Sequence, residues 1–417
     1  MPRPAAADTA LTPAEFGRLL RPLLAPGVKK LAVACSGGPD SLCLALLCHE
    51  WGQAHGIEVT ALIVDHRLRP ESGAEARQAQ VWLKAAGLPA IILPWLGDKP
   101  AGNRQALARH ARFHLLETWC QSQGVAHLLL AQHRDDQAET LLLRAARGSG
   151  VDGLAGMAPS SVSAAGIIRL RPLLDVPKSR LLATLQVRGQ PWAEDPSNHN
   201  PAYARSGARA ALPLLGAEAA AHLALTARNL ARARAALEQI AAERLAASVA
   251  FEPAVGLAWI EAGIMLTGPD EIALRALDRL LRRIGGLALP PRLERLERLL
   301  AALRAGDMSH TLHRCRLLPW QGKLLAVREA RHLPAPIRLG PGMADFVWDG
   351  RFRVTLGPGL PRGLSLAALA DLAPPATGDL PSPAWPGLPV LLRRNRPVAL
   401  PSLFAGRING LICNPFT

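Results

Sequence analysis

The sequence predicts an α/β fold in which a doubly wound parallel sheet is followed by a helical domain and a small α+β C-terminal domain. Three observations predict it. Short apolar runs of strand character alternate with helical patterns in the first half of the chain, a glycine turn joins the first of these strands to an apolar helix, and polar residues follow several strand ends. The strands are expected at 28–34, 57–64, 90–94, 125–131 and 166–170.

The turn after the first strand has the features of an anion site. Gly37 and Gly38 allow positive φ angles and close backbone approach, and Pro39 lacks an N–H that the first turn of the following apolar helix, 41–51, would leave unpaired. The turn therefore places backbone amides at a helix N-terminus, where they bind anions.

The side chains of this turn add to that expectation. Ser36 and Ser41 contribute hydroxyl donors, and Asp40 either caps the helix or holds a cation beside a phosphate. No lysine follows the glycines, so the turn differs from the G-x-x-x-x-G-K-S/T loop of common nucleotide triphosphatases.

Polar residues also follow the later strands. Asp65 and His66 end the second strand, His133 follows the fourth, and Arg171 follows the fifth. A helix expected between residues 75 and 83 separates the second and third strands, and the helix 103–119 carries Arg109 and Arg112 at i and i+3 on one face. In a doubly wound sheet ligands bind outside the carboxyl ends of the strands, so these side chains predict an active site there.

The segment after the fourth strand is the richest in chemistry. Its packing stripe, at i, i+3, i+4 and i+7, predicts a helix, and Asp135, Asp136 and Glu139 concentrate negative charge near its start. Acids early and arginines late also complement a helix dipole, which would account for Asp136 or Arg147 singly. At a strand end facing a phosphate loop, however, the acids could hold Mg²⁺ or an ammonium group, and His133 could transfer a proton near neutral pH.

The remainder of the chain predicts helices first and strands later. Helices are expected at 217–247, 270–284 and 292–305, β-like patterning at 311–327 and 345–356, a short helix at 366–372, and a loosely constrained linker near 373–388. The arginines of the first helix, Arg228, Arg232 and Arg234, form either a phosphate-contacting face or a solvated one.

The composition of the chain limits the classes of partner and the cellular compartment that we expect. The 417 residues carry a formal net charge of +15 with a sequence pI near 10.7, which favours a polyanionic partner, although a genome that prefers arginine would give a similar excess. The six cysteines form no C-x-x-C pair and no zinc spacing, and the chain shows no signal peptide and no apolar run of membrane length. These features predict a cytoplasmic protein with no membrane partner.

Two sets of motifs resemble a known family. Ser36-Gly-Gly-Pro-Asp-Ser41 is similar to the SGGxDS pyrophosphate loop of the PP-loop ATP pyrophosphatases, whose fold is of the adenine nucleotide alpha-hydrolase type. The segment from His133 to Met157 resembles the HxDDQAET block and following glycines of tRNA(Ile)-lysidine synthetases. Further blocks resemble the same family in the same order, at 64–69, 102–109, 112–113, 171–174 and 192–198.

This resemblance implies an activity and its substrates. Enzymes of the family use ATP, with Mg²⁺, to attach L-lysine to C2 of the wobble cytidine of an isoleucine tRNA with a CAU anticodon. They release AMP and diphosphate through an adenylated cytidine intermediate and leave lysidine in the tRNA. The resemblance therefore implies a carbon–nitrogen ligase that acts in tRNA modification.

The resemblance also implies roles for matching residues. Ser36, Gly37, Gly38, Pro39, Asp40 and Ser41 would bind the ATP phosphates, Asp40 and Asp136 the metal, and Asp65 and His66 would flank the nucleotide. Arg109, Arg112, His133, Asp135, Asp136, Glu139 and Arg147 would line the pocket for ATP, lysine and cytidine, and Arg171, Asp195, Asn198, Arg205 and Arg209 would contact substrate or tRNA. The base that deprotonates lysine would be His133 or one of the acids beside it.

One motif departs from the family pattern, and several questions stay open. In Arg205-Ser-Gly-Ala-Arg209, Ser206 and Ala208 replace the Asn and Ile of the usual RNxIR form, which affects the expected tRNA contacts rather than the reaction. The expected domains are a catalytic domain at 1–215, a helical tRNA-binding domain at 216–305 and a C-terminal, tRNA-contacting domain at 306–417. A homodimer is one open alternative for the oligomeric state.

Two other functions compete with the ligase. A PP-loop sulfur transferase of the 2-thiocytidine type would adenylate the same oxygen, but it generally needs paired cysteines that this chain lacks. A non-catalytic basic RNA-binding protein would account for the charge and leave the phosphate loop and the acids unexplained.

Overall fold

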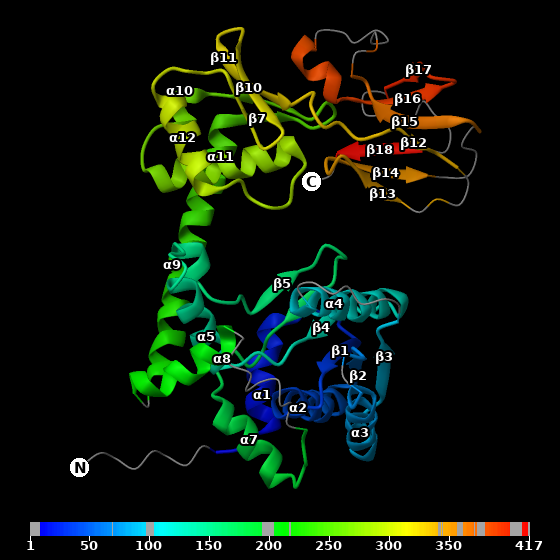
Figure 1. The fold of residues 1–417 in the computed structure, drawn as a ribbon, viewed down its shortest axis with the longest axis vertical. Coiled ribbons are helices and arrows are strands. Elements are labelled where there is room, and N and C mark those ends of the chain that lie inside the picture. The colour runs from blue at the N-terminus through cyan, green and yellow to red at the C-terminus, as the bar shows by residue number, and fades with distance from the viewer. Residues whose placement is uncertain are drawn as a thin grey trace. The chain divides into compact units, whose positions relative to one another are not determined.

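The chain folds into two compact units, Met1–Arg234 and Ala235–Thr417 (Figure 1). The computed structural model describes residues 9–68, 70–96, 104–193, 204–216, 218–340, 343, 345–356, 362–370, 372, 380–400 and 411–415.

The first unit is built on a six-stranded sheet with the order β3-β2-β1-β4-β6-β5. All neighbouring strands are parallel except the edge strand β5, which pairs antiparallel with β6 and was not expected from the sequence. The strands are β1 (Lys30–Cys35), β2 (Glu58–Asp65), β3 (Ala90–Pro94), β4 (His127–Leu129), β5 (Ser160–Val162) and β6 (Ile168–Leu170). The doubly wound parallel sheet predicted from the sequence is thereby confirmed.

Side chains of β1 alternate between two buried faces. Leu31 and Val33 pack in one core and Ala32 and Ala34 in the other. After the exposed Lys30 the strand is apolar because neither face meets water. The helices of the unit are α1 (Pro13–Leu20), α2 (Pro39–His55), α3 (Ser72–Ala85), α4 (Arg104–Ser122), α5 (Arg134–Ala145), α6 (Val151–Leu154), α7 (Lys178–Val187) and α8 (Ala204–Ala211), with short 3-10 turns at Arg21–Leu23 and Leu212–Leu215.

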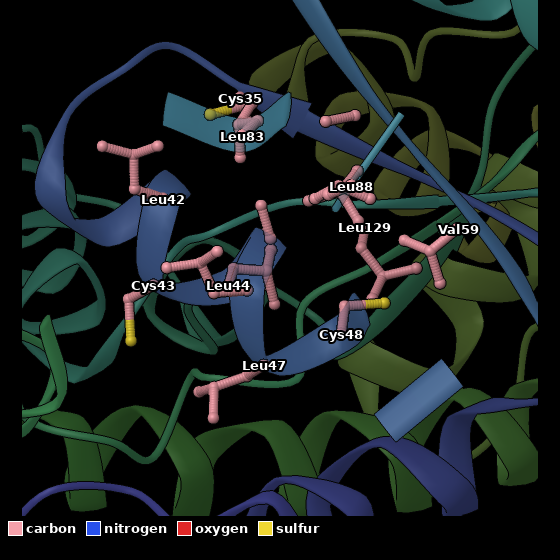
Figure 2. Close-up of a cluster of buried hydrophobic side chains, with 14 of the residues drawn as sticks. Cys35, Leu42, Cys43, Leu44, Leu47, Cys48, Val59, Leu83, Leu88 and Leu129 are labelled. Atoms are coloured by element: carbon pink, nitrogen blue, oxygen red, sulfur yellow. The ribbon is translucent and has the colours of Figure 1, made fainter. Parts of the chain in front are cut away.

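Different helices pack on the two faces of the sheet. Helices α1, α2, α3 and α7 fill the core drawn in Figure 2, where Leu44 and Leu47 of α2 and Leu83 of α3 lie among the side chains of β1, β2 and β4. Leu116 and Cys120 of α4 pack in the core on the other face. Residues 41–48 of α2 are all buried, which agrees with the apolar helix that the sequence predicts at 41–51.

The strand order reverses at β1. The chain moves outward from β1 to β2 and β3, then crosses through α4 to β4, which pairs with the opposite edge of β1. The carboxyl ends of β1 and β4 are therefore neighbours, with Ala32 opposite Leu128 and Val33 opposite Leu129. This is the switch point at which such sheets bind ligands.

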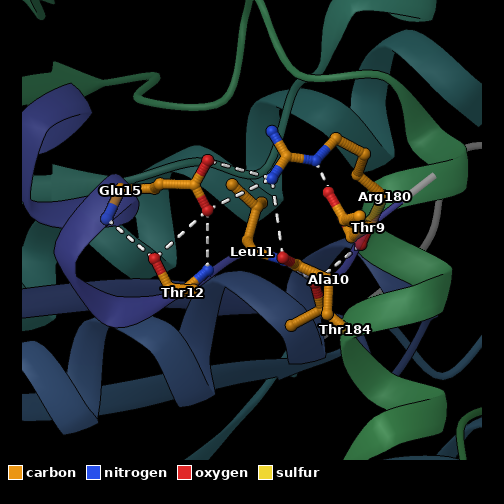
Figure 3. Close-up of polar contacts among 7 residues, drawn as sticks. All are labelled: Thr9, Ala10, Leu11, Thr12, Glu15, Arg180 and Thr184. Carbon is orange, nitrogen blue, oxygen red and sulfur yellow. Dashed lines mark hydrogen bonds and ion pairs between the residues drawn. The ribbon is translucent and has the colours of Figure 1, made fainter. Parts of the chain in front are cut away.

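A polar cluster attaches α1 to α7 (Figure 3). Thr12 caps α1, since its hydroxyl accepts from the Glu15 amide while the Glu15 carboxylate accepts from the Thr12 amide. Arg180 of α7 donates to both oxygens of Glu15 at 3.1 and 3.2 Å, and the Leu11 amide donates to Thr184 at 2.7 Å.

The helix α9 (Ala219–Ser248) begins in the first unit and ends in the second. The second unit then contains α10 (Ala262–Met265), α11 (Asp270–Gly285) and α12 (Leu293–Arg304), which pack on a five-stranded sheet with the order β7-β8-β11-β10-β9. Its strands are β7 (Val249–Glu252), β8 (Leu257–Ile260), β9 (His310–Leu312), β10 (Cys315–Trp320) and β11 (Lys323–Arg328). Strands β7 and β8, which lie between two predicted helices, were not expected from the sequence.

Two smaller sheets complete the second unit, β12-β15-β16-β17 and β13-β14-β18. Their strands are β12 (Ile337–Arg338), β13 (Phe346–Trp348), β14 (Phe352–Leu356), β15 (Leu364–Ala368), β16 (Pro389–Arg393), β17 (Arg396–Ala399) and β18 (Leu411–Pro415).

Two local predictions in this region are wrong. The helix expected at 366–372 is instead the strand β15, which pairs with β12 and β16 because its apolar side chains fill the cores of the small sheets. The linker expected near 373–388 lies outside the described residues at 373–379. At 382–387 it forms a 3-10 turn whose Ala384 is 3% exposed, so this part is packed rather than loose.

The described residues include no single helix that is long and apolar enough to cross a membrane, and one bent pair, Arg205–Leu215 with Ala219–Ser248, reaches that threshold by length and composition only.

Candidate active site

The Ser41 hydroxyl stabilises the glycine turn between β1 and α2 through two hydrogen bonds to the turn's backbone. The Ser36 amide donates to the Ser41 hydroxyl at 3.0 Å, and that hydroxyl lies 3.0 Å from the Gly38 carbonyl, to which it donates. Gly37 has a φ of +83°, and a Cβ there would lie 3.2 Å from the Ala79 side chain, so a larger residue would be strained. Gly38 caps α2 without a side-chain hydrogen bond, which leaves the helix N-terminus open to an anion.

His133 begins the neighbouring helix, α5. Its Nδ1 accepts from the Asp135 amide at 3.2 Å, and its own amide donates to Asp136 at 3.1 Å, which forms a capping box. The side chain is almost fully buried, and Nε2 lies 3.6 Å from one oxygen of Asp40 and 3.6 Å from one oxygen of Asp136.

These contacts define the charge state that the imidazole favours. Burial lowers the pKa of His133, but its hydrogen bond with Asp40 and the charges of Asp136, Asp40 and Asp135 outweigh burial, so the pKa is raised overall. The cap contact, in which Nδ1 accepts the Asp135 amide, belongs to the neutral ring with its proton on Nε2, as assigned from the hydrogen-bond network. Protonation, which the neighbouring acids favour, gives up that contact and makes both ring nitrogens donors. The ring thus holds two carboxylates in place and has no free lone pair toward them.

Asp40 lies in the first turn of α2 and faces cations from two other helices. Its Oδ2 is 3.6 Å from His133 and 3.7 Å from Nζ of Lys178. Burial raises the pKa of Asp40, but the hydrogen bond and charge of His133, with the charges of Lys178 and Arg209, lower it overall. The carboxylate is therefore ionised at neutral pH, and its buried Oδ1 has no hydrogen-bond partner.

Lys178 is a site residue that the sequence analysis missed. It is the first residue of α7, directly after Pro177, and lies beside Asp40 because the Arg134 amide of α5 donates to the Val176 carbonyl at 2.9 Å. One signal could have found it: a lysine at a helix N-terminus opposes the helix dipole, so it indicates a nearby anion.

Glu139 lies one turn further along α5 and is only 1% exposed. Its Oε1 accepts from Nε of Arg209 at 2.7 Å, and its Oε2 is buried without a hydrogen-bond partner. Because a buried carboxylate oxygen without a partner is costly, this side chain is suited to a cationic ligand.

Five arginines form a cluster in which each side chain is within electrostatic reach of at least one other. They are Arg109, Arg112, Arg169, Arg171 and Arg205. Burial and the charges of Arg205 and Arg169 lower the pKa of Arg109, and burial with the charges of Arg169 and Arg109 lowers the pKa of Arg171. The Arg112 side chain is solvent-exposed, yet surrounding protein and the charge of Arg109 lower its pKa. Mutual repulsion of this kind is relieved by a bound polyanion.

Two members of this cluster have partners within the protein. Arg169, which the sequence analysis did not name, donates to Glu117 at 2.7 Å. Arg171 donates to the Ala158 carbonyl at 2.9 Å and to Ser161 at 3.1 Å, while its Nε is buried without a hydrogen-bond partner.

Asp65 and His66 shape the loop after β2. Asp65 is 7% exposed and accepts hydrogen bonds from the Arg67 amide at 3.1 Å and from the Ser72 hydroxyl at 2.8 Å. His66 accepts through Nδ1 from the Leu68 amide at 3.1 Å. Both side chains therefore maintain the loop in this structure.

The roles of the remaining predicted residues stay predictions. Arg147 is exposed in the turn that follows α5. Asp195 and Asn198 lie outside the described residues.

The carboxylates fit a magnesium ion. The described residues contain no group of three or more metal-ligating side chains. However, Mg²⁺ is usually held by one or two carboxylates together with substrate phosphates, and Asp40 and Asp136 share one neighbour, His133, beside an anion site. The unpartnered Oδ1 of Asp40 is an oxygen that such an ion would satisfy.

The cysteine side chains that the structure describes are all buried. Burial raises the pKa of Cys43 to about 12 and that of Cys120 to about 12. Such thiols are poor sulfur carriers because the thiolate is the reactive form.

Comparison with known proteins agrees with the geometry. Residues 11–214 match the model of a PP-loop domain. The chain is 43% identical over 282 residues to a tRNA(Ile)-lysidine synthase of Bradyrhizobium diazoefficiens, covering 66% of this chain and 78% of that protein. It is 38% identical over 339 residues to one from Ruegeria pomeroyi, covering 79% and 77%.

Among solved structures, the chain resembles the U34-tRNA thiolase NcsA from Methanococcus maripaludis, determined with its 4Fe-4S cluster. The TM-score is 0.46 at 19% identity, over 52% of this chain and 79% of that one.

Proposed function

Since the chain belongs to the tRNA(Ile)-lysidine synthase family, we propose that it is an ATP-dependent ligase that converts a cytidine of tRNA(Ile) to lysidine. One observation carries this proposal. The N-terminus of α2, which Gly38 caps without a side-chain hydrogen bond, and the acidic start of α5 lie side by side at the switch point of the sheet.

ATP is the activating substrate. The glycine turn would bind its phosphates, and O2 of the wobble cytidine would attack the α-phosphorus. The bond between the α- and β-phosphates then breaks, its electron pair leaves with the diphosphate, and AMP remains on O2 as a good leaving group. Turn amides and arginines would stabilise the charge that develops.

Asp40 and Asp136 are the residues proposed to hold Mg²⁺. When bound, the ion would neutralise part of the negative charge on the ATP phosphates. His133 holds the two carboxylates toward one another through Nε2, so we assign it a positioning role in this arrangement.

L-Lysine is the proposed nucleophile, and Glu139 is the residue best suited to its ammonium groups. Glu139 is buried and has one oxygen without a hydrogen-bond partner, and Asp135 lies nearby at the start of the same helix. The attacking amine must be neutral, so it loses a proton before it attacks C2. The acids of α5 are the candidates for that base, since Nδ1 of His133 accepts the Asp135 amide.

The CAU-anticodon tRNA(Ile) is the proposed nucleic-acid partner. The exposed Arg109, Arg112 and Arg205 would contact its phosphates, and Arg209 would keep Glu139 in place. We propose that residues 1–215 form the catalytic domain and that the regions 216–305 and 306–417, which share the sheet β7-β8-β11-β10-β9, contact the tRNA. The net charge of +15 supports a polyanionic partner.

The experiment is incubation of the protein with this tRNA, ATP, Mg²⁺ and labelled lysine. Label is expected to enter the tRNA, with one AMP and one diphosphate released for each lysine. Absence of label with intact protein and tRNA would refute the ligase assignment. A parallel reaction with labelled sulfide tests the sulfur-transferase alternative, and we expect no sulfur in the tRNA.

A further inference from the structure

Three helices of the first unit begin at one place. Asp40 is in the first turn of α2, His133 caps α5, and Lys178 is the first residue of α7. Asp40 contacts both other residues, at 3.6 and 3.7 Å, and the backbone hydrogen bond from Arg134 to Val176 joins the starts of α5 and α7. Each helix N-terminus carries partial positive charge, so their meeting makes a strongly anion-attracting place.

Lys178 is electrostatically out of place in the protein alone. A cation at a helix N-terminus is repelled by the helix dipole, and here two further helix N-termini lie nearby. Its acidic neighbour Asp40 is shared with His133, at a comparable distance. The Lys178 side chain is 36% exposed, so it retains access to a ligand.

The glycine turn supplies the complementary observation. No lysine follows its glycines, although a lysine in that position holds the terminal phosphates in the common P-loop. Lys178 lies beside Asp40, and therefore beside the same turn, but it comes from a different helix, α7, far later in the chain.

We propose that Lys178 is the phosphate-binding lysine of this site. Without nucleotide its ammonium pairs with Asp40, and with ATP it binds the β- and γ-phosphates. As the bond between the α- and β-phosphates breaks, the diphosphate takes the electron pair, and Lys178 stabilises that charge while keeping its protons. This inference rests on the proposed function only in taking ATP as the substrate.

The experiment measures ATP affinity in EDTA and ATP affinity with Mg²⁺ for the wild type, Lys178→Met and Lys178→Arg. We expect Lys178→Met to weaken ATP binding about tenfold or more in both conditions, because a charge-assisted hydrogen bond is lost. Lys178→Arg should keep most of the affinity. Lys84→Met is the matched control, since Lys84 is exposed in the last turn of α3, and its affinity should equal that of the wild type.

A purely structural role predicts a different pattern. If Lys178 only neutralised Asp40, the Asp40 carboxylate would repel ATP in the Lys178→Met protein. Adding Asp40→Asn would then restore metal-free ATP affinity. We expect the double variant to remain weak, while Asp40→Asn alone binds metal-free ATP at least as well as the wild type. Restoration in the double variant, or wild-type affinity in Lys178→Met, would overturn the proposal.

Two readouts separate this inference from the ligase assignment. Thermal unfolding of each variant shows whether it folds, and Lys178→Gln takes the place of Lys178→Met in the comparison if the methionine variant does not fold. Failure of the wild type to transfer lysine would refute the ligase and leave the ATP-affinity comparison standing. Conversely, equal ATP affinities would refute the role of Lys178 in an active ligase.

Discussion

Asp40 is the residue on which the contacts of the site centre. Its Oδ2 lies 3.6 Å from Nε2 of His133 and 3.7 Å from Nζ of Lys178, and its pKa is lowered, so it is ionised when it faces the glycine turn. One carboxylate thus links three helices, and its second oxygen is left for a further cation.

Asp40→Ala should therefore abolish formation of AMP and diphosphate while tRNA binding stays within about twofold of the wild type. The change removes a proposed metal ligand, whereas the arginines that would contact the tRNA are untouched. Diphosphate release and tRNA filter binding measure the two effects. Asp307→Ala, at a side chain 63% exposed in the second unit, is the control. Near-normal turnover of Asp40→Ala would reject its assigned role.

Glu139 permits a separate prediction about lysine. Glu139→Gln keeps an oxygen to accept from Arg209 and removes the buried negative charge. We expect KM for lysine to rise about tenfold or more, as a charge-assisted contact is lost, while diphosphate release from ATP and tRNA persists. Glu243→Gln, an exposed change on α9, should leave both quantities unchanged. A KM for lysine equal to that of the wild type would show that another acid binds the ammonium.

Among the helices, α1 shows how a terminal segment is attached to the catalytic unit. Its capping box fixes Glu15, and the contact of Glu15 with Arg180 joins α1 to α7, the helix that carries Lys178 (Figure 3). The hydrogen bond from the Thr12 amide and the contact with Arg180 lower the pKa of Glu15 below its ordinary value of 4.5.

This shift makes a pH-dependent contribution to stability with a defined sign. Because the pKa of Glu15 is lower in the folded protein, the contribution is full above the unfolded value of 4.5 and is lost as pH falls through the folded-state pKa. Glu15→Gln should thus lower Tm at pH 7, and the difference from the wild type should shrink toward zero in acid. Thermal unfolding across this range measures it, and a difference that grows in acid would contradict the assignment.

In the whole molecule, each unit has its own buried core and its own fixed polar features. In the second unit Asp349, 1% exposed, lies between two guanidiniums, at 3.0 Å from Arg328 and 2.8 Å from Arg351. Burial, outweighing Asp349, lowers the pKa of Arg351 to about 10. This triad joins β11 to the turn between β13 and β14, so it connects different sheets of that unit.

Asp349→Ala should destabilise the second unit by about 3–5 kcal/mol, because it leaves two buried cations without their anion. Calorimetry should show a lowered transition for this unit and an unchanged one for the first, whose core shares no residue with the triad. The exposed Asp345→Ala, which removes one hydrogen bond to Thr355, is the matched control. Equal effects of the two changes would contradict the role of the buried triad.

Local patterns in the sequence were enough to predict much of this protein. The parallel strands, the turn at Gly37 and Gly38, and the acidic start of α5 follow from hydrophobic periodicity and turn chemistry, which act over a few residues. The same reasoning erred at 366–372, where the apolar run is a strand, because short apolar runs do not distinguish helix from strand without their partners.

The tertiary structure alone decided which distant residues meet. The pairs Lys178 with Asp40 and Arg209 with Glu139 are separated by many residues, and no local pattern records them. They form because the strand order reverses at β1 and brings the ends of separate helices to one edge of the sheet. Motif and charge pattern thus determined the kind of site, and the topology of the chain determined its members, since contacts between distant residues depend on the fold as a whole.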